Sequence, residues 1–349
     1  MKYKFLALFI GVLLALCTLS GCSCASITIL TFSKDYLGGY NGIVTSYQET
    51  LTYQVTYAND VIKPLSTFES GILPTYNGEL VTTLIKLSSR QEVKDICDSD
   101  LLEKEQADIY KFTTQLNLTV THHCFKQENP QDVKIDGVNG TREDSIVSEV
   151  YFFSQDASFA PIYSKTTASY TLFNLNPTNP RYAVEEYTGE TTYYVNRAEK
   201  IFIQDKTSTT STNYTYKAVI DNAQLLFAVR NLNFGTETAL ALPTMSYQYP
   251  STTNLAFRFN DTSTKDGLSI SCKGNNHTSA KVKDISFNIN SQNTSGAKQY
   301  FKVQLKDENS TLPYNSLLIQ YDQPLHDYHS NQAYGGLQYK LTSVDISIN

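Results

Sequence analysis

The chain has 349 residues, of which 41% are hydrophobic and 12% aromatic, too many for a disordered chain and enough to fill a core. Its formal net charge of −6 argues against nucleic-acid binding, which needs a basic surface. The aromatic residues are 25 Tyr and 17 Phe, with no Trp. Because Tyr, Thr and Ile favour strands, this composition predicts a mainly β protein.

The first residues have the layout of a secretory signal peptide. Lys2 and Lys4 precede an apolar run from Phe5 to Leu16, which is short compared with the about 20 apolar residues of a membrane-spanning helix. The run leads into Leu19-Ser20-Gly21-Cys22, which resembles the lipobox of bacterial lipoproteins. The resemblance implies diacylglycerol on the Cys22 thiol and cleavage just before it. An ordinary cleaved signal peptide and an uncleaved anchor are the alternatives.

Cleavage before Cys22 also changes the charge of the protein. Loss of Lys2 and Lys4 moves the formal charge from −6 to −8, so an anionic membrane surface would repel the mature chain. The lipid must then do the anchoring, for which two acyl chains are sufficient. We therefore expect a lipid-anchored protein on the extracytoplasmic face of the cell membrane. Residues 22–46 are expected to form a tether rich in Ser, Gly and Thr, and residues 47–349 a single antiparallel β domain.

Strand patterns recur along that domain. Apolar and polar residues alternate over Leu51–Tyr57, Leu116–Val120, Phe301–Leu305 and Leu337–Leu341, as in strands with one face on a core and one in water. Further strands are expected near residues 79–88, 145–154, 160–173, 180–196, 239–249, 254–260, 281–289 and 315–321. Turn signals such as Gly335-Gly336 separate these segments, and residues 205–214 are expected to form a loop.

Two helices are expected among the strands. Ser89-Arg90-Gln91-Glu92 has the form of a capping box, followed by Val93, Ile96, Cys97 and Leu101 on one helical face. The second helix, Asp221–Leu232, begins with a capping sequence and is apolar enough to be buried against the sheet. Its ordinary role is that of a core helix. Its candidate ligand-contact residues are Leu225, Leu226, Phe227 and Val229.

The order of these elements supports a resemblance. A long antiparallel meander, the inserted Asp221–Leu232 helix and the closing strands Leu317–Tyr321 and Leu337–Leu341 are similar to the half-barrel of LolA/LolB-type lipoprotein carriers and to a related family of uncharacterised envelope proteins. The resemblance implies a large twisted sheet or half-barrel with two short helices packed on it. In carriers of this type the concave face holds acyl chains, so the resemblance implies an apolar or amphipathic ligand there.

No motif supports a catalytic, cofactor or metal assignment. The densest ionisable cluster is Asp322, His326, Asp327 and His329, but Pro324 within it indicates a solvated loop. His122 and His123 are adjacent on a strand and therefore point to opposite faces. The acidic residues between 132 and 144 lack the ligand order of a calcium-binding loop and indicate a solvated hairpin.

The cysteines and asparagines leave alternatives open. After processing, Cys24, Cys97, Cys124 and Cys272 remain without the close spacing of a zinc or redox motif. We interpret Cys97 as a buried helix residue, with a Cys97–Cys124 disulfide as the alternative that export permits. Several Asn-x-Ser/Thr triplets could carry glycans in a eukaryotic secreted protein and count against a bacterial source.

The sequence thus predicts a non-enzymatic cell-envelope lipoprotein. Its expected partners are the membrane, through the lipid on Cys22, and a lipid or other apolar ligand on the concave sheet face. One alternative is a structural or adhesive surface protein that binds a protein or glycan partner. A more remote alternative is a hydrolase that uses the cluster at residues 321–329.

Overall fold

A computed structural model describes the domain from residue 46 onward. The described residues are 46–58, 70–94, 96, 108–126, 140–153, 161–173, 184–196, 201–204, 211–213, 221, 223–231, 239–243, 254–265, 270–272, 275–277, 282–289, 298–304, 317–326 and 333–348.

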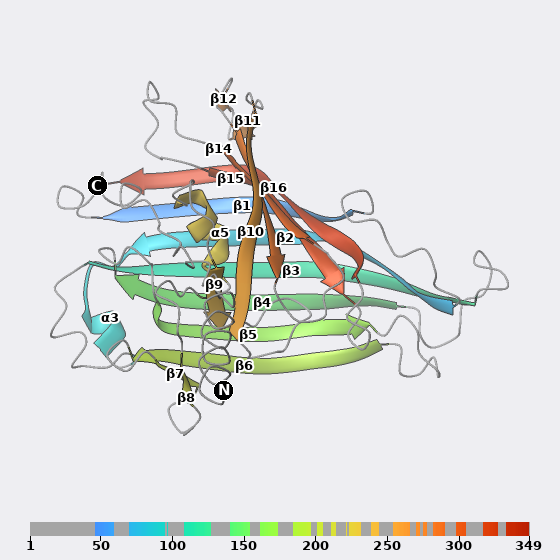
Figure 1. The fold of residues 1–349 in the computed structure, drawn as a ribbon, viewed down its shortest axis with the longest axis horizontal. Helices are drawn as coiled ribbons and strands as arrows, with labels where there is room; N and C mark the ends of the chain where they lie inside the picture. Colours follow the sequence, from blue (N-terminus) through green and yellow to red (C-terminus); the bar gives the residue numbers. More distant parts are fainter. Residues whose placement is uncertain are drawn as a thin grey trace, which may run out of the picture.

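The described residues form one sheet of fourteen antiparallel strands and a separate two-stranded hairpin (Figure 1). The strands that precede the central helix in sequence are β1 (Tyr47–Ala58), β2 (Ser70–Lys86), β3 (Ile109–Lys126), β4 (Gly140–Phe153), β5 (Pro161–Phe173), β6 (Val184–Asn196), β7 (Ile201–Gln204) and β8 (Ser211–Asn213). Those that follow it in the sheet are β9 (Ala239–Pro243), β10 (Asn254–Lys265), β13 (Val282–Ile289), β14 (Lys298–Gln304), β15 (Leu317–His326) and β16 (Ala333–Ile348). The hairpin pairs β11 (Ile270–Cys272) with β12 (Asn275–His277).

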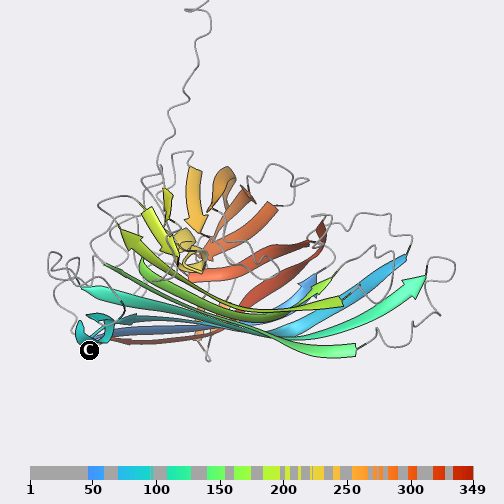
Figure 2. The same ribbon diagram turned by 90° about the horizontal axis from the view of Figure 1, so that it is seen from below.

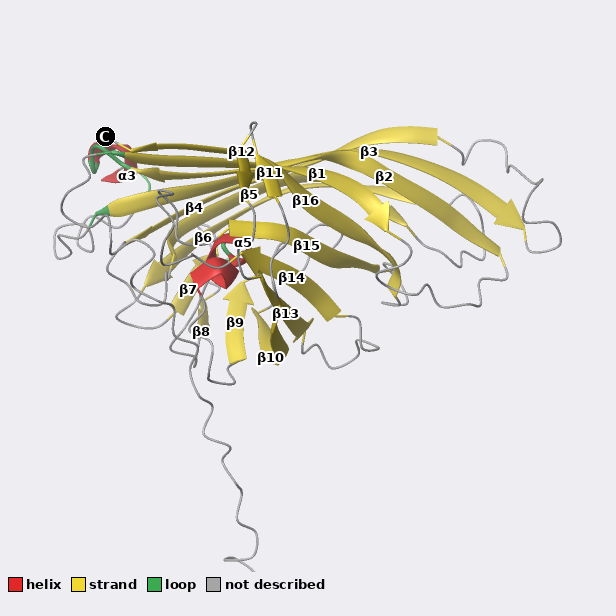
Figure 3. Cartoon of the chain, turned by 90° about the horizontal axis from the view of Figure 1, so that it is seen from above, coloured by secondary structure: helices red, strands yellow, loops and turns green. Residues whose placement is uncertain are grey.

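The strand order explains why a helix lies inside this fold. The sheet runs β8-β7-β6-β5-β4-β3-β2-β1-β16-β15-β14-β13-β10-β9, so the first and last strands pair in the middle and β8 and β9 form opposite edges. The chain between β8 and β9 must therefore cross the sheet. It does so through α5 (Leu225–Ala228) and the 3-10 turn η2 (Val229–Asn231), which lie on the concave side (Figures 1 and 3).

The sheet is strongly curved and not closed (Figure 2). Its long strands β1–β6 form a trough, and β9–β14 turn across the trough so that α5 lies between the two parts (Figures 1 and 2). Along β1, Tyr47, Leu51, Tyr53 and Val55 are buried while Gln48 and Gln54 are exposed. We call the concave side, which carries the main core, the inner face, and the opposite side the outer face.

A second, smaller core lies on the outer face near one end of β3–β5. The helix α3 (Gln91–Lys94) begins after Ser89, whose hydroxyl accepts a hydrogen bond from the Gln91 N–H at 3.1 Å. Val93 from α3 is fully buried against residues of β3, β4 and β5. The predicted cap at Ser89 is therefore confirmed, with Gln91 as its partner, and the predicted helical face is buried at Val93. Cys97 and Leu101 lie outside the described residues.

The expected fold class is confirmed: a large antiparallel twisted sheet with two short helices packed on it. Some local predictions were wrong. Gly335-Gly336 is not a turn, because both residues belong to β16 and pair with β15, and Gly335 allows the Tyr57 ring to approach closely. Within the expected loop at residues 205–214, Ser211–Asn213 form β8. The predicted hairpin at residues 132–144 is wrong at its end, since Asp144 lies in β4 and is buried.

Candidate functional site

The inner face is crossed by residues 221–231, which we call the crossing segment. Asp221 fixes its start: one carboxylate oxygen accepts a hydrogen bond from the Ala223 N–H at 2.8 Å and the other from the Ser164 hydroxyl of β5 at 2.6 Å. The Asp221 N–H in turn donates to Gln224 Oε1 at 2.9 Å. These reciprocal hydrogen bonds hold the turn that leads into α5, whose own N-cap residue is Gln224. Burial raises the pKa of Asp221, and the hydrogen bonds from Ser164 and Ala223 oppose that shift.

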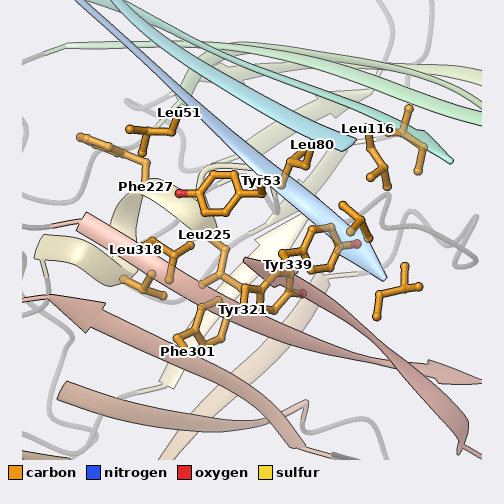
Figure 4. Close-up of a cluster of buried hydrophobic side chains, with 14 of the residues drawn as sticks. Leu51, Tyr53, Leu80, Leu116, Leu225, Phe227, Phe301, Leu318, Tyr321 and Tyr339 are labelled. Atoms are coloured by element: carbon orange, nitrogen blue, oxygen red, sulfur yellow. The ribbon is translucent and has the colours of Figure 1, made fainter. Parts of the chain in front are cut away.

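The middle of the crossing segment is packed into the main core. The Phe227 ring lies 5.7 Å from the rings of both Phe112 and Phe152, on β3 and β4. Figure 4 shows Leu225 and Phe227 among inner-face side chains. Of the four residues predicted to contact a ligand, Leu225, Phe227 and Val229 are buried and Leu226 is half-buried against the same core. The four residues therefore lie on the inner face and contact protein side chains there, and their contact with a ligand stays a prediction.

The end of the crossing segment is held by a buried ion pair. Arg230 donates from its two terminal nitrogens to the two carboxylate oxygens of Glu49 at 2.6 and 2.8 Å, and both side chains are 1% exposed. The Tyr47 hydroxyl donates a further hydrogen bond to Glu49 at 3.1 Å. A charged pair removed from water persists when its geometry is good and its remaining lone pairs are satisfied. Glu49 therefore fixes where the segment returns to β1.

A row of buried hydroxyls crosses the inner face between apolar rows. Each of the five strands from β2 to β6 contributes one residue to this row, and each residue pairs directly with the next one across the sheet. The hydroxyls of Ser148 and Thr166 are hydrogen-bonded to each other at 2.8 Å. All of them are buried. The row consists of Thr82, Thr114, Ser148, Thr166 and Thr191. The inner face is thus mixed in chemistry: a polar stripe with apolar surface on both sides.

Further along the strands lies what we call the aromatic end of the inner face. On β1, Tyr57 is eight residues beyond Glu49, which is about 26 Å in an extended strand. Rings from β1, β2, β5 and β6 gather there, with contacts between Tyr57 and Tyr76, Tyr76 and Phe173, and Tyr170 and Tyr187. The aromatic end also includes three rings of β14, β15 and β16 that stack in turn: Phe301 on Tyr321 at 4.6 Å, and Tyr321 on Tyr339 at 5.0 Å.

Two glutamines flank this stack of rings. The Tyr339 hydroxyl donates to Gln323 Oε1 at 2.9 Å, and burial raises the pKa of Tyr339 so that the hydroxyl keeps its proton. Tyr300 pairs with Asp322, so the antiparallel register places Gln299 beside Gln323 on the inner face. Both glutamines are buried.

The ionisable cluster at residues 321–329 was predicted to form a solvated loop. This prediction is wrong as far as His326, because Leu317–His326 form β15. Asp322 is buried and accepts hydrogen bonds from Gln320 and Gln338 on the outer face. Asp322 and His326 are four residues apart, about 13 Å in a strand, too far for both to bind one metal ion. Asp327 and His329 lie outside the described residues, and within the described part of the chain no cluster could hold a metal ion.

Glu49, Arg230, Gln299 and the hydroxyl row were not among the predicted site residues. A signal for Glu49 is present in the sequence, because it shares a face with Tyr47 and Leu51 in the strand alternation. Arg230 is likewise a lone charge in an apolar helical pattern. The hydroxyl row has no comparable signal, because it exists only once the register of five strands is known.

Comparison with known proteins gives limited information on this site. No family model and no curated protein matches the chain. A solved β-barrel-like protein of the domain of unknown function DUF1849 from Brucella abortus is similar over 87% of this chain and 99% of its own, with 10% identity and a TM-score of 0.45. These comparisons indicate no enzyme family. Among the described residues, no helix is long and apolar enough to span a membrane. Cys22 and the rest of the leader lie outside the described residues.

Proposed function

We propose that the protein is a non-enzymatic cell-envelope lipoprotein that binds an apolar or amphipathic ligand on the inner face of its half-barrel. Diacylglycerol on Cys22 would hold it on the extracytoplasmic face of the membrane. The observation that carries the proposal is the mixed chemistry of the inner face. Apolar and aromatic rows suit a hydrocarbon chain, and the hydroxyl row between them suits polar groups along it.

The crossing segment supports a role in ligand binding at the same face. The segment is anchored to the sheet at its two ends: Asp221 accepts a hydrogen bond from Ser164, and Arg230 forms the ion pair with Glu49. Between these anchors, Leu226 is half-buried and packs against the main core. A ligand chain on the inner face would therefore lie beside Leu226.

Ligand binding is tested by native mass spectrometry of residues 23–349 purified from a bacterial cytoplasm. We expect co-purified lipid in the native chain and its loss in Leu226→Glu. Leu87→Glu is the matched control, because Leu87 is also half-buried but packs on the smaller outer-face core. If the native chain shows an apo mass even after incubation with envelope lipids, the ligand-binding proposal is wrong.

The lipid anchor is tested separately. With the full chain in a bacterial host, labelled palmitate should be incorporated into the native protein and lost in Cys22→Ser. Cys24→Ser is the control, because Cys24 is not preceded by a lipobox. Label retained in Cys22→Ser would contradict lipidation at this residue.

The second candidate is a structural or adhesive protein whose outer face binds a protein or glycan. Among the described residues, Tyr300 is the exposed large hydrophobic side chain, at 39%, and it lies opposite Asp322 and its amide partners on that face. Amphipathic tyrosines are common in such contacts. Under this candidate, Tyr300→Ala should weaken attachment to a surface partner while leaving any co-purified lipid unchanged.

A further inference from the structure

Gln299, on β14, carries a buried acceptor that protein folding alone does not explain. Its side chain is 4% exposed, and among the described residues no donor lies within hydrogen-bonding distance of Oε1. A buried carbonyl oxygen without a partner costs about 1–3 kcal/mol, so native proteins rarely keep one without a reason. An apolar residue at this position would avoid that cost.

The surroundings of Gln299 limit what could bind there. Gln299 is two residues from Phe301 and shares its face, and it lies beside Gln323, which accepts the Tyr339 hydroxyl. Directly paired residues of neighbouring strands point to the same face of the sheet. Lys302 and Lys340 both pair with Gln320, and Asp322 pairs with Tyr300, so these charged side chains of β14–β16 lie on the outer face. A ligand group at Gln299 therefore meets an amide acceptor and aromatic rings without an ionised partner on these strands.

We infer that Gln299 binds the head group of the ligand, and that this head group is neutral and carries hydroxyl donors, as glycerol or a sugar does. A hydroxyl from the head group donates to Gln299 Oε1 beside the Phe301–Tyr321–Tyr339 stack, and the apolar chain lies toward the crossing segment. A phosphate or carboxylate head group offers acceptors where the site needs a donor. This inference rests on the ligand-binding role proposed above and names its ligand class.

The test uses calorimetric titration of residues 23–349 with ligands that carry different head groups on an eight-carbon chain. Monooctanoylglycerol and octyl glucoside carry hydroxyls, methyl octanoate carries no donor, and octanoate is anionic. We expect the hydroxyl-bearing ligands to bind the native chain about 3- to 10-fold more tightly than methyl octanoate, as one neutral hydrogen bond allows. Tighter binding of monooctanoylglycerol would indicate a glycerol head group, and tighter binding of octyl glucoside would indicate a sugar.

The variant Gln299→Met removes the acceptor and keeps much of the side-chain volume. It should abolish the preference for hydroxyl-bearing ligands while retaining affinity for methyl octanoate. It should also unfold at a higher urea concentration, because a buried group without a partner has been removed. Gln115→Met, the same exchange at an exposed position on β3, should leave the preference intact.

The outcomes separate the two proposals. If all neutral ligands bind the native chain equally, the inference about Gln299 is wrong and the ligand-binding role stands. The same conclusion follows if Gln299→Met keeps the preference, as it would if a buried water satisfied Gln299. If no ligand binds the native chain, the ligand-binding role itself is overturned. If Gln299→Met does not fold, equal binding of all neutral ligands by the native chain still overturns the inference about Gln299.

Discussion

The two ends of the inner face differ in how their polar groups are used. At the crossing segment, Glu49, Arg230 and Asp221 all have protein partners at hydrogen-bonding distance. Glu49 and Arg230 offset each other's charge, and Asp221 accepts hydrogen bonds from Ser164 and Ala223. At the aromatic end, stacked rings surround two glutamines, and the Oε1 of one of them lacks a partner among the described residues. The first arrangement fixes the path of the chain, and the second leaves a buried acceptor, to which we have assigned a ligand head group as a proposal.

This difference follows from topology. Because β8 and β9 lie on opposite edges, the connection between them has to be placed on the inner face at a defined position. A buried ion pair is weak evidence for stability, but it specifies position well because both partners are costly to leave unpaired. Among the described residues, no connection of this kind lies over the aromatic end.

The largest expected effect is at the ion pair. Arg230→Met leaves the Glu49 carboxylate buried without its partner and should lower the free energy of unfolding by about 3–5 kcal/mol. The double variant Glu49→Leu with Arg230→Met should recover most of that loss, because no buried charge remains. Urea unfolding of the three proteins measures both effects. A single variant as stable as the native chain would show that Glu49 and Arg230 do not hold the crossing segment.

A smaller loss of stability is expected when a side chain is added at a crowded glycine near the aromatic end. A Cβ at Gly78 would lie 2.0 Å from the Asn117 carbonyl oxygen, so Gly78→Ala should separate β2 from β3 and cost about 1–3 kcal/mol. The comparison is Gly335→Ala, where the atoms in the way are the hydroxyl and ring carbons of the Tyr57 side chain and not backbone. Thermal unfolding should place Gly78→Ala below Gly335→Ala. The reverse order would mean that the strand backbones can adjust more easily than the Tyr57 ring.

The aromatic end offers a third, smaller test of a paired polar group. Tyr339→Phe removes the donor to Gln323 Oε1 and keeps the ring in the stack, so we expect a loss of about 1 kcal/mol in urea unfolding. Tyr300→Phe is the control, since Tyr300 is exposed on β14. Equal stabilities of the two variants would mean that the Tyr339–Gln323 hydrogen bond contributes nothing.

Much of the fold could be predicted because its signals are local. Alternation along Leu51–Tyr57 and Leu337–Leu341 placed β1 and β16, and the apolar periodicity after Asp221 placed the second helix. Its start was predicted too early, because α5 begins at Leu225. The site could be predicted only in part, because it depends on which strands are neighbours. Nothing near Glu49 in the sequence indicates Arg230, which is 181 residues away. Pro324 suggested a loop where the structure has β15, because pairing with β16, at Gly336, holds the strand extended there.

The smallest expected effect is the pH dependence of the cap at the crossing segment. Burial raises the pKa of Asp221 above its ordinary value of 3.8, so the folded protein holds this proton more tightly than the unfolded chain. The stabilising contribution is therefore complete below pH 3.8 and is lost as the pH rises through the raised value in the folded protein. Asp221→Asn, which keeps an acceptor for the Ala223 N–H, should lack this component, so its stability relative to the native chain should increase over that pH range.

Urea unfolding at a series of pH values measures the difference, and Asp345→Asn, at an exposed position on β16, is the control. If the difference between Asp221→Asn and the native chain does not change with pH, burial does not govern the titration of Asp221, and the cap is more accessible to water than its hydrogen bonds indicate.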